Sequence, residues 1–75
     1  MQLAVYVIYE LLIRVQELNP EAGEYVSYKK INSGVAVRTT TGSIEIPDHL
    51  LTEQFNNPAS IKEAEILALM ESFKP

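Results

Sequence analysis

The stretch Gln2–Asn19, QLAVYVIYELLIRVQELN, holds the densest run of apolar residues in the chain. Read as a helix, it places Glu10, Arg14 and Glu17 on one side, because residues three or four positions apart share a helix face. Read as a strand, it lacks alternation and is too long. The sequence therefore predicts a long N-terminal helix with one polar stripe. Its first two turns are almost entirely apolar, so they require cover on more than one side.

Three short strands are predicted after this helix. Asn19-Pro20 ends the helix, since proline disfavours helical geometry in the residue before it. From Glu24 the composition changes to residues that favour strands. Two turns, at Asn32-Ser33-Gly34 and at Thr41-Gly42, then divide the segment. The expected strands run from residue 24 to the first turn, over 35–40 and over 43–46, and they form an antiparallel meander.

The second hairpin allows its register to be predicted. With Thr41 and Gly42 as a two-residue loop, Arg38 faces Glu45 across the strands. Apolar and polar residues then separate cleanly. The inward face would hold Val35, Val37, Thr39, Ile44 and Ile46, and the outward face Ala36, Arg38, Thr40, Ser43 and Glu45.

The first hairpin leaves two registers open. One turns Lys30 inward beside Val26 and Tyr28, and the other places Ile31 and Lys29 on one side. In both hairpins we expect the turn glycine, Gly34 or Gly42, to adopt a positive φ.

Two further helices are predicted after the sheet. Pro47 stops the third strand, and Asp48 can cap a short helix from His49 to Phe55. The last helix runs to about Phe73. It has two candidate starts, which are Asn57 as the cap before Pro58 and Ser60 with Glu63 in a capping box. Residues 1–75 are therefore expected to form a single small α+β domain of order α-β-β-β-α-α, in which the three-stranded antiparallel meander packs against the N-terminal and C-terminal helices in two layers.

Composition excludes several kinds of site. The 75 residues contain no cysteine and one histidine, so neither disulfides nor the usual zinc site of one chain can form. Glu10 and Arg14 interrupt the apolar N-terminal run well short of the roughly 20 residues of a membrane span. The run also lacks the basic start of a signal peptide. We expect a soluble cytoplasmic protein that uses no cofactor and does not bind membranes.

Catalytic residues are scarce in this sequence. His49, with Asp48 and Glu53, forms the one cluster of ligand-type side chains near a helix start, but its spacing matches no metal motif. A surface histidine just after a helix cap explains it better. No cysteine nucleophile, G-x-S-x-G turn or phosphate-binding glycine loop is present. The sequence therefore predicts that the protein is not an enzyme, with no catalytic, cofactor or metal residues.

A homodimer is predicted from the surplus of apolar surface. On the last helix Ile61, Ala64, Leu67 and Ala68 mark one apolar stripe, and further apolar residues extend it around the helix. A chain of this length buries only about 60% of the surface that its unfolded form exposes. Two-fold pairing is the commonest way to cover such a surplus. The predicted interface residues are Leu3, Tyr6, Ile13, Ile66, Met70 and Phe73.

The predicted function is binding to another protein. A net charge of −4 and the lack of catalytic parts are typical of small acidic regulators and of inhibitor proteins carried by phages and plasmids. The alternative is a nucleic-acid-binding module, because a segment without acids combines cations with aromatic rings. Its residues would be Tyr25, Tyr28, Lys29, Lys30 and Arg38.

Overall fold

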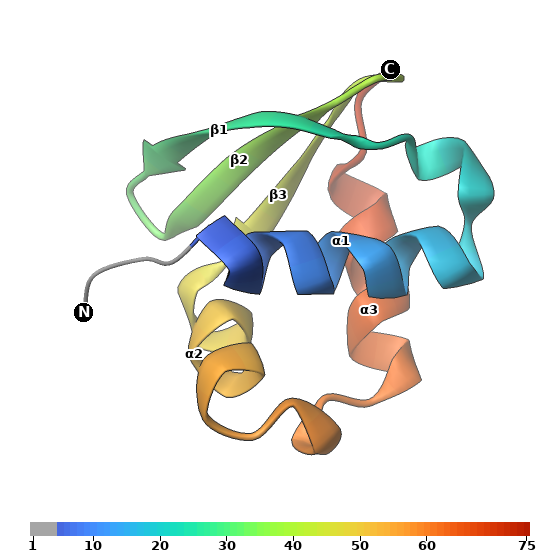
Figure 1. Ribbon diagram of the computed structural model, residues 1–75. Helices are drawn as coiled ribbons and strands as arrows, with labels where there is room; N and C mark the ends of the chain where they lie inside the picture. Colours follow the sequence, from blue (N-terminus) through green and yellow to red (C-terminus); the bar gives the residue numbers. More distant parts are fainter. Residues whose placement is uncertain (1–4) are drawn as a thin grey trace.

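A three-stranded antiparallel sheet forms one layer of the molecule and helices form the other (Figure 1). The computed structural model describes residues 5–75. The observed order, α-β-β-β-α-α, confirms the predicted α+β class. The elements are α1 (Val5–Leu18), β1 (Tyr25–Ile31), β2 (Gly34–Thr39), β3 (Ser43–Pro47), α2 (Asp48–Asn56) and α3 (Glu63–Leu69), with 3₁₀ turns η1 (Pro20–Ala22), η2 (Pro58–Ser60) and η3 (Met70–Ser72).

Helix α1 packs against α2 and α3, and these two helices also contact the sheet directly, α2 at β2 and β3 and α3 at β3 (Figure 1). Its inward side follows the three-and-four spacing of an amphipathic helix. The buried residues on that side are Val7, Ile8, Leu11, Leu12 and Val15. The predicted N-terminal helix is thus confirmed from Val5 onward, and its predicted first residues, Gln2–Ala4, lie outside the described part of the chain.

The predicted faces of the second hairpin are confirmed, but its register is wrong. Val37 pairs with Ile44, and Arg38 lies opposite Ser43, whereas Glu45 lies opposite Ala36. Observed and predicted registers differ by two residues. Because side chains alternate with a period of two, such a shift keeps every residue on its face. The expected inward residues, Val35, Val37, Thr39, Ile44 and Ile46, are accordingly all buried.

The loop between β2 and β3 lies one residue earlier than predicted, which explains the shift. Thr39 and Gly42 exchange backbone hydrogen bonds at 2.7 and 3.4 Å, so Thr40 and Thr41 are the two loop residues. The hydroxyl of Thr39 accepts hydrogen bonds from the backbone N–H groups of Thr41 at 3.3 Å and Gly42 at 3.1 Å. Thr39 is buried, so its side chain closes the loop from inside.

A β-bulge in β1 determines the register of the first hairpin. Tyr28 lies opposite Val37 and Lys30 opposite Val35, so both belong to the helix-facing side of the sheet. The register shifts between Tyr25 and Ser27, because one extra residue is accommodated there. Lys30 therefore lies beside Tyr28 on the helix-facing side of the sheet, as in one of the two predicted registers, although its side chain remains 62% exposed. Val26, which that register also placed there, sits in the bulge instead.

The two turn glycines are needed for a reason other than φ. Gly34 and Gly42 do not have positive φ, so that prediction is wrong; Gly23, at φ +82°, does. A Cβ atom at Gly34 would overlap the backbone carbonyl of Ile46, and one at Gly42 would overlap that of Lys74. Close approach of a neighbouring backbone excludes a side chain at both positions.

Both predicted helix starts in the C-terminal half are displaced. Asp48 is the first residue of α2 rather than its cap. Helix α3 begins at Glu63, where the carboxylate of Glu65 accepts from the Lys62 N–H at 3.2 Å, so the Ser60–Glu63 capping box is wrong. The alternative start at Pro58 is real but opens only the 3₁₀ turn η2.

The buried side of α3 differs from the predicted stripe. Ile66 and Leu69 enter the core, whereas Ala64, Leu67 and Ala68 face outward. The short residues Ala64 and Ala68 gain little from burial compared with the larger pair. Only Ile61, from the predicted stripe, is buried.

The two edges of the sheet differ. Ser43 of β3 exchanges two backbone hydrogen bonds with Lys74, at 2.8 and 2.9 Å. The hydroxyl of Ser72 accepts from the Glu45 N–H at 3.0 Å. The C-terminal segment thus covers the edge of β3, whereas within residues 5–75 no strand pairs with the outer edge of β1. None of the helices in this range is long and apolar enough to cross a membrane.

Candidate interaction surface

The outer side of α1 exposes large apolar side chains. Tyr6 is 57% exposed and Tyr9 52%, and Val5 and Ile13 are also exposed. Val5, Tyr9 and Ile13 follow one another at intervals of four, which places them in a row along the helix. Such side chains lose contact with water only when another molecule covers them.

Strand β1 extends this row of side chains. The rings of Tyr9 and Tyr25 lie with their centroids 5.8 Å apart at 49°, within the range of favourable aromatic pairs. The surface made by Val5, Tyr6, Tyr9, Ile13 and Tyr25 is hereafter called the α1–β1 face.

A shallow hollow of about 280 Å³ lies where α1 meets β1. Its lining comprises Tyr9, Leu12, Ile13, Gln16, Glu24 and Tyr25. The side-chain amide of Gln16 donates to the carbonyl of Gly23, and the Glu24 N–H donates to the Thr40 hydroxyl at 3.0 Å. These two bonds fix the segment just before β1 against α1 and against the sheet. The hollow is therefore held in shape by hydrogen bonds.

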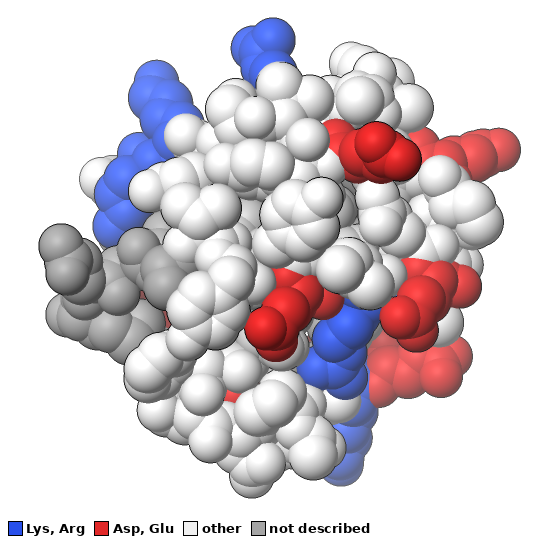
Figure 2. Space-filling model, viewed as in Figure 1, with Lys and Arg blue, Asp and Glu red and all other residues white. Residues whose placement is uncertain are grey.

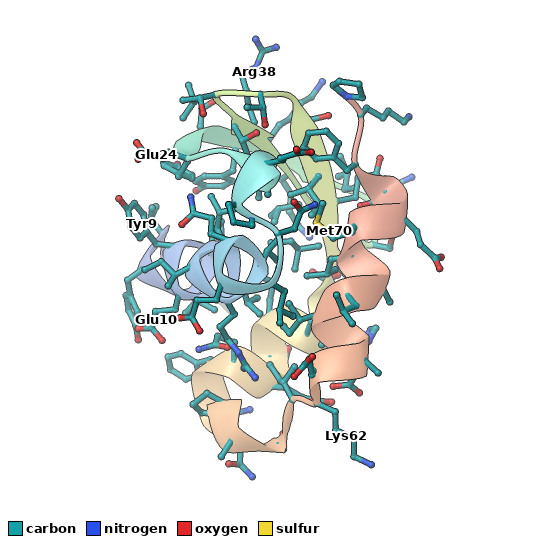
Figure 3. All side chains as sticks on the ribbon, turned by 90° about the vertical axis from the view of Figure 1, so that its right-hand side faces the viewer. Tyr9, Glu10, Glu24, Arg38, Lys62 and Met70 are labelled. Atoms are coloured by element: carbon teal, nitrogen blue, oxygen red, sulfur yellow. The ribbon has the colours of Figure 1, made fainter. Side chains whose placement is uncertain are left out.

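Acidic side chains lie beside the α1–β1 face. Figure 2 shows a largely uncharged area over α1, with acids beside it and to the right of the view. In Figure 3, Tyr9, Glu10 and Glu24 project on the same side of the molecule. Arg38 and Lys62 project at the top and bottom of that view. Charges next to the exposed aromatic rings are therefore mainly negative.

Arg14, the cation nearest to these acids in the sequence, forms hydrogen bonds with other parts of the same chain. Arg14 donates to the side-chain oxygen of Gln54 at 3.2 Å and to the backbone carbonyls of Pro58 at 3.1 Å and Ile61 at 2.9 Å. Gln54 is buried and donates in turn to the carboxylate of Glu10 at 2.9 Å. The predicted polar stripe of α1 is thus partly structural, since Arg14 ties α1 to the α2–α3 connection.

The predicted dimer residues do not form one surface. Tyr6 and Ile13 lie on the α1–β1 face, and Leu3 lies outside the described residues. Ile66 is 1% exposed and belongs to the core, so its side chain is not available to a partner. Met70 and Phe73 are half-buried and line a separate hollow of about 430 Å³. Asn19, Glu21, Thr41 and Pro75 complete that hollow.

The predicted nucleic-acid residues are divided between the two faces of the sheet. Tyr25, Tyr28 and Lys30 lie opposite inward residues of β2, whereas Lys29 lies opposite Ala36 and turns outward with Arg38. Residues opposite each other in an antiparallel pair point to the same side. Lys30 is engaged with the Asp48 carboxylate at 3.3 Å. The structure does not bring these five side chains together.

Side chains for catalysis or metal binding are dispersed. His49, Asp48 and Glu53 all lie on α2, and His49 is exposed. Among the residues that the structure describes, no three His, Cys, Asp or Glu side chains are placed to hold a metal ion. The α1–β1 face combines exposed aromatic side chains with a hollow, and it is therefore the candidate interaction surface.

Sequence reasoning found part of this face and missed the rest. Tyr6 and Ile13 were selected as exposed apolar residues of a helix. Val5 and Tyr9 follow the same spacing as Ile13 and could have been selected with it. The contact between Tyr9 and Tyr25 depends on the bulge in β1, for which the sequence carries no recognisable signal.

Comparison with known proteins gives no further indication of function. No protein-family model matches the sequence, and neither a curated protein nor a solved structure shows a significant match. Function must therefore be inferred from the surface itself.

Proposed function

We propose that this chain is a non-enzymatic protein-binding module whose contact surface is the α1–β1 face. The observation that carries the proposal is the row of exposed apolar side chains on α1, continued onto β1 by the pairing of Tyr9 with Tyr25. Contiguous exposed apolar surface with a polar border is typical of interaction sites. Tyrosine is enriched at interfaces because its ring is large and rigid and its hydroxyl tolerates water.

A small acidic regulator or inhibitor protein would act in this way. Such a protein needs no reaction chemistry, because it changes the activity of its partner by covering part of the partner's surface. The Arg14 network and the apolar core keep α1 fixed, so little ordering entropy is lost at the backbone when a partner binds.

Site-specific photocrosslinking tests the proposal. A benzophenone amino acid replaces Tyr6 on the α1–β1 face in one variant and Leu67 on α3 in a matched control, since Leu67 is an exposed apolar residue elsewhere. In extract of the source cell, we expect a specific crosslinked partner from position 6 and none from position 67. Adding Tyr9→Asp should abolish the crosslink. Equal crosslinking from both positions would contradict the proposal.

The homodimer predicted from the sequence is the second candidate. It is favoured by the exposure of Tyr6 and Ile13 on the same side of α1. Light scattering at micromolar concentration tests it, because a dimer has twice the chain mass of 8.4 kDa. Tyr6→Glu and Ile13→Glu should then restore the mass of one chain, whereas Leu67→Glu should not. A mass of 8.4 kDa for the unmodified protein would reject the dimer and leave the α1–β1 face free for another protein.

A further inference from the structure

We infer that the hollow between α1 and β1 receives an arginine or lysine side chain from a basic segment of the partner protein. This inference rests on the proposed function of the α1–β1 face and specifies the chemistry of the partner. It is based on a hollow that is lined by two tyrosine rings and has acidic side chains in and beside it.

The lining suits a long cationic side chain. Leu12 and Ile13 supply an apolar surface for the methylene groups, which lysine and arginine bury while their charged ends stay near water. The rings of Tyr9 and Tyr25, 5.8 Å apart, both line the hollow, and an aromatic ring attracts a cation that lies over its face. Glu24 lies in the same lining and provides a carboxylate for the charged end. A planar guanidinium fits this set particularly well, since it can stack on a ring and pair with a carboxylate at once.

Charge distinguishes between the candidate occupants of the hollow. Glu10 and Glu24 project on the side of Tyr9 (Figure 3), and Glu24 lines the hollow itself. Arg14 keeps its positive charge, because the oxygens that accept its hydrogen bonds are neutral, but its guanidinium is directed to Gln54, Pro58 and Ile61 and does not line the hollow. A second copy would bring the same acids to the interface, and nucleic acid would bring phosphates. A basic protein segment is the occupant with complementary charge.

A titration with a defined probe tests the inference. The probe is N-acetyl-arginine amide, added to the ¹⁵N-labelled full chain and followed by the shifts of backbone amide signals. N-acetyl-citrulline amide has nearly the same shape without the charge and serves as the matched ligand. We expect saturable shifts around residues 9–16 and 23–26 with the arginine probe, and at least about threefold weaker binding of the citrulline probe.

Two variants that each remove one carboxylate test whether the arginine probe binds at the hollow. Glu24→Gln removes the charge at the hollow and should weaken binding of the arginine probe about threefold to fivefold. Glu71→Gln removes one negative charge on η3, outside the hollow, and should leave the affinity unchanged. Tyr9→Leu should also weaken binding while keeping the position apolar. Equal binding of the two probes, or an unchanged affinity in Glu24→Gln, would overturn the inference.

This result is separable from the test of the proposed function. If position 6 crosslinks to a partner but the arginine probe does not bind preferentially, the face is an interface and the inference about a cationic side chain is wrong. If the probe binds as expected but no partner crosslinks, the hollow is confirmed as a cation site and the proposed function fails instead.

Discussion

The guanidinium of Arg14 donates a hydrogen bond to the side chain of Gln54, which lies 40 residues further along the chain. Arg14 also binds two backbone carbonyls of the α2–α3 connection, and Gln54 binds Glu10. A single side chain therefore joins the first helix to the segment that links the last two helices.

Arg14→Met should destabilise the protein by about 1–3 kcal/mol. The substitution keeps much of the apolar stem but leaves the oxygen of the buried Gln54 side chain without its donor, and such an unpaired group retains its full desolvation cost. Urea denaturation measures the free energy of unfolding. Arg38→Met, at an exposed position of β2, is the matched control and should change it by less than about 0.5 kcal/mol. Equal losses in both variants would show that the network contributes nothing.

Gly34→Ala should cost about 1–3 kcal/mol, because the added methyl group meets the backbone of Ile46 and the strands must separate to admit it. Thermal unfolding followed by circular dichroism measures this effect. Ser33→Ala, at the neighbouring exposed turn position, serves as the control and should be tolerated. An unchanged melting temperature for Gly34→Ala would mean that β2 and β3 do not approach so closely.

Thr39→Val should cost about 1 kcal/mol. The change keeps the shape of the buried side chain but removes the hydroxyl that accepts from Thr41 and Gly42. Thr52→Val makes the same chemical change at an exposed position of α2 and should have little effect. Chemical denaturation of the two variants compares them directly. If both lose the same free energy, the loop does not depend on this hydroxyl.

Ser72→Ala should speed hydrogen exchange at the Glu45 amide by roughly fivefold, since the amide loses an acceptor worth about 1 kcal/mol. Amide exchange followed by nuclear magnetic resonance resolves this single site. Amides of β2, which pair with backbone on both sides, should keep their rates. A uniform acceleration across the sheet would indicate global destabilisation rather than the loss of one local contact.

The fold was largely predictable because hydrophobic periodicity reports which face a residue occupies. It predicted the order of elements and the inward residues of β2 and β3. It could not fix the register, since two-residue loops at Thr40-Thr41 and at Thr41-Gly42 give registers that differ by two positions and leave every residue on the same face. The two glycines were recognised as special, but the reason lies in a backbone distant in sequence.

The candidate surface was less predictable. Exposure of Tyr6 followed from its place on α1, whereas Ile66 was assigned to the surface although it completes the core. Periodicity shows that a helix has two apolar sides but not which of them a neighbouring element will cover. Links such as Arg14 to Ile61, across 47 positions, leave no local pattern in the sequence.

The contrast between the two sheet edges limits how copies of this protein could polymerise. A strand edge can recruit another strand, and a sheet with two free edges can add neighbours without end, as amyloid fibres do. Here Ser43 and Glu45 are occupied by the chain's own C-terminal segment, so only β1 could accept a neighbour among the described strands. Two such molecules joined edge to edge would each have used that edge. The assembly would end as a closed pair and could not grow into a filament through its strands.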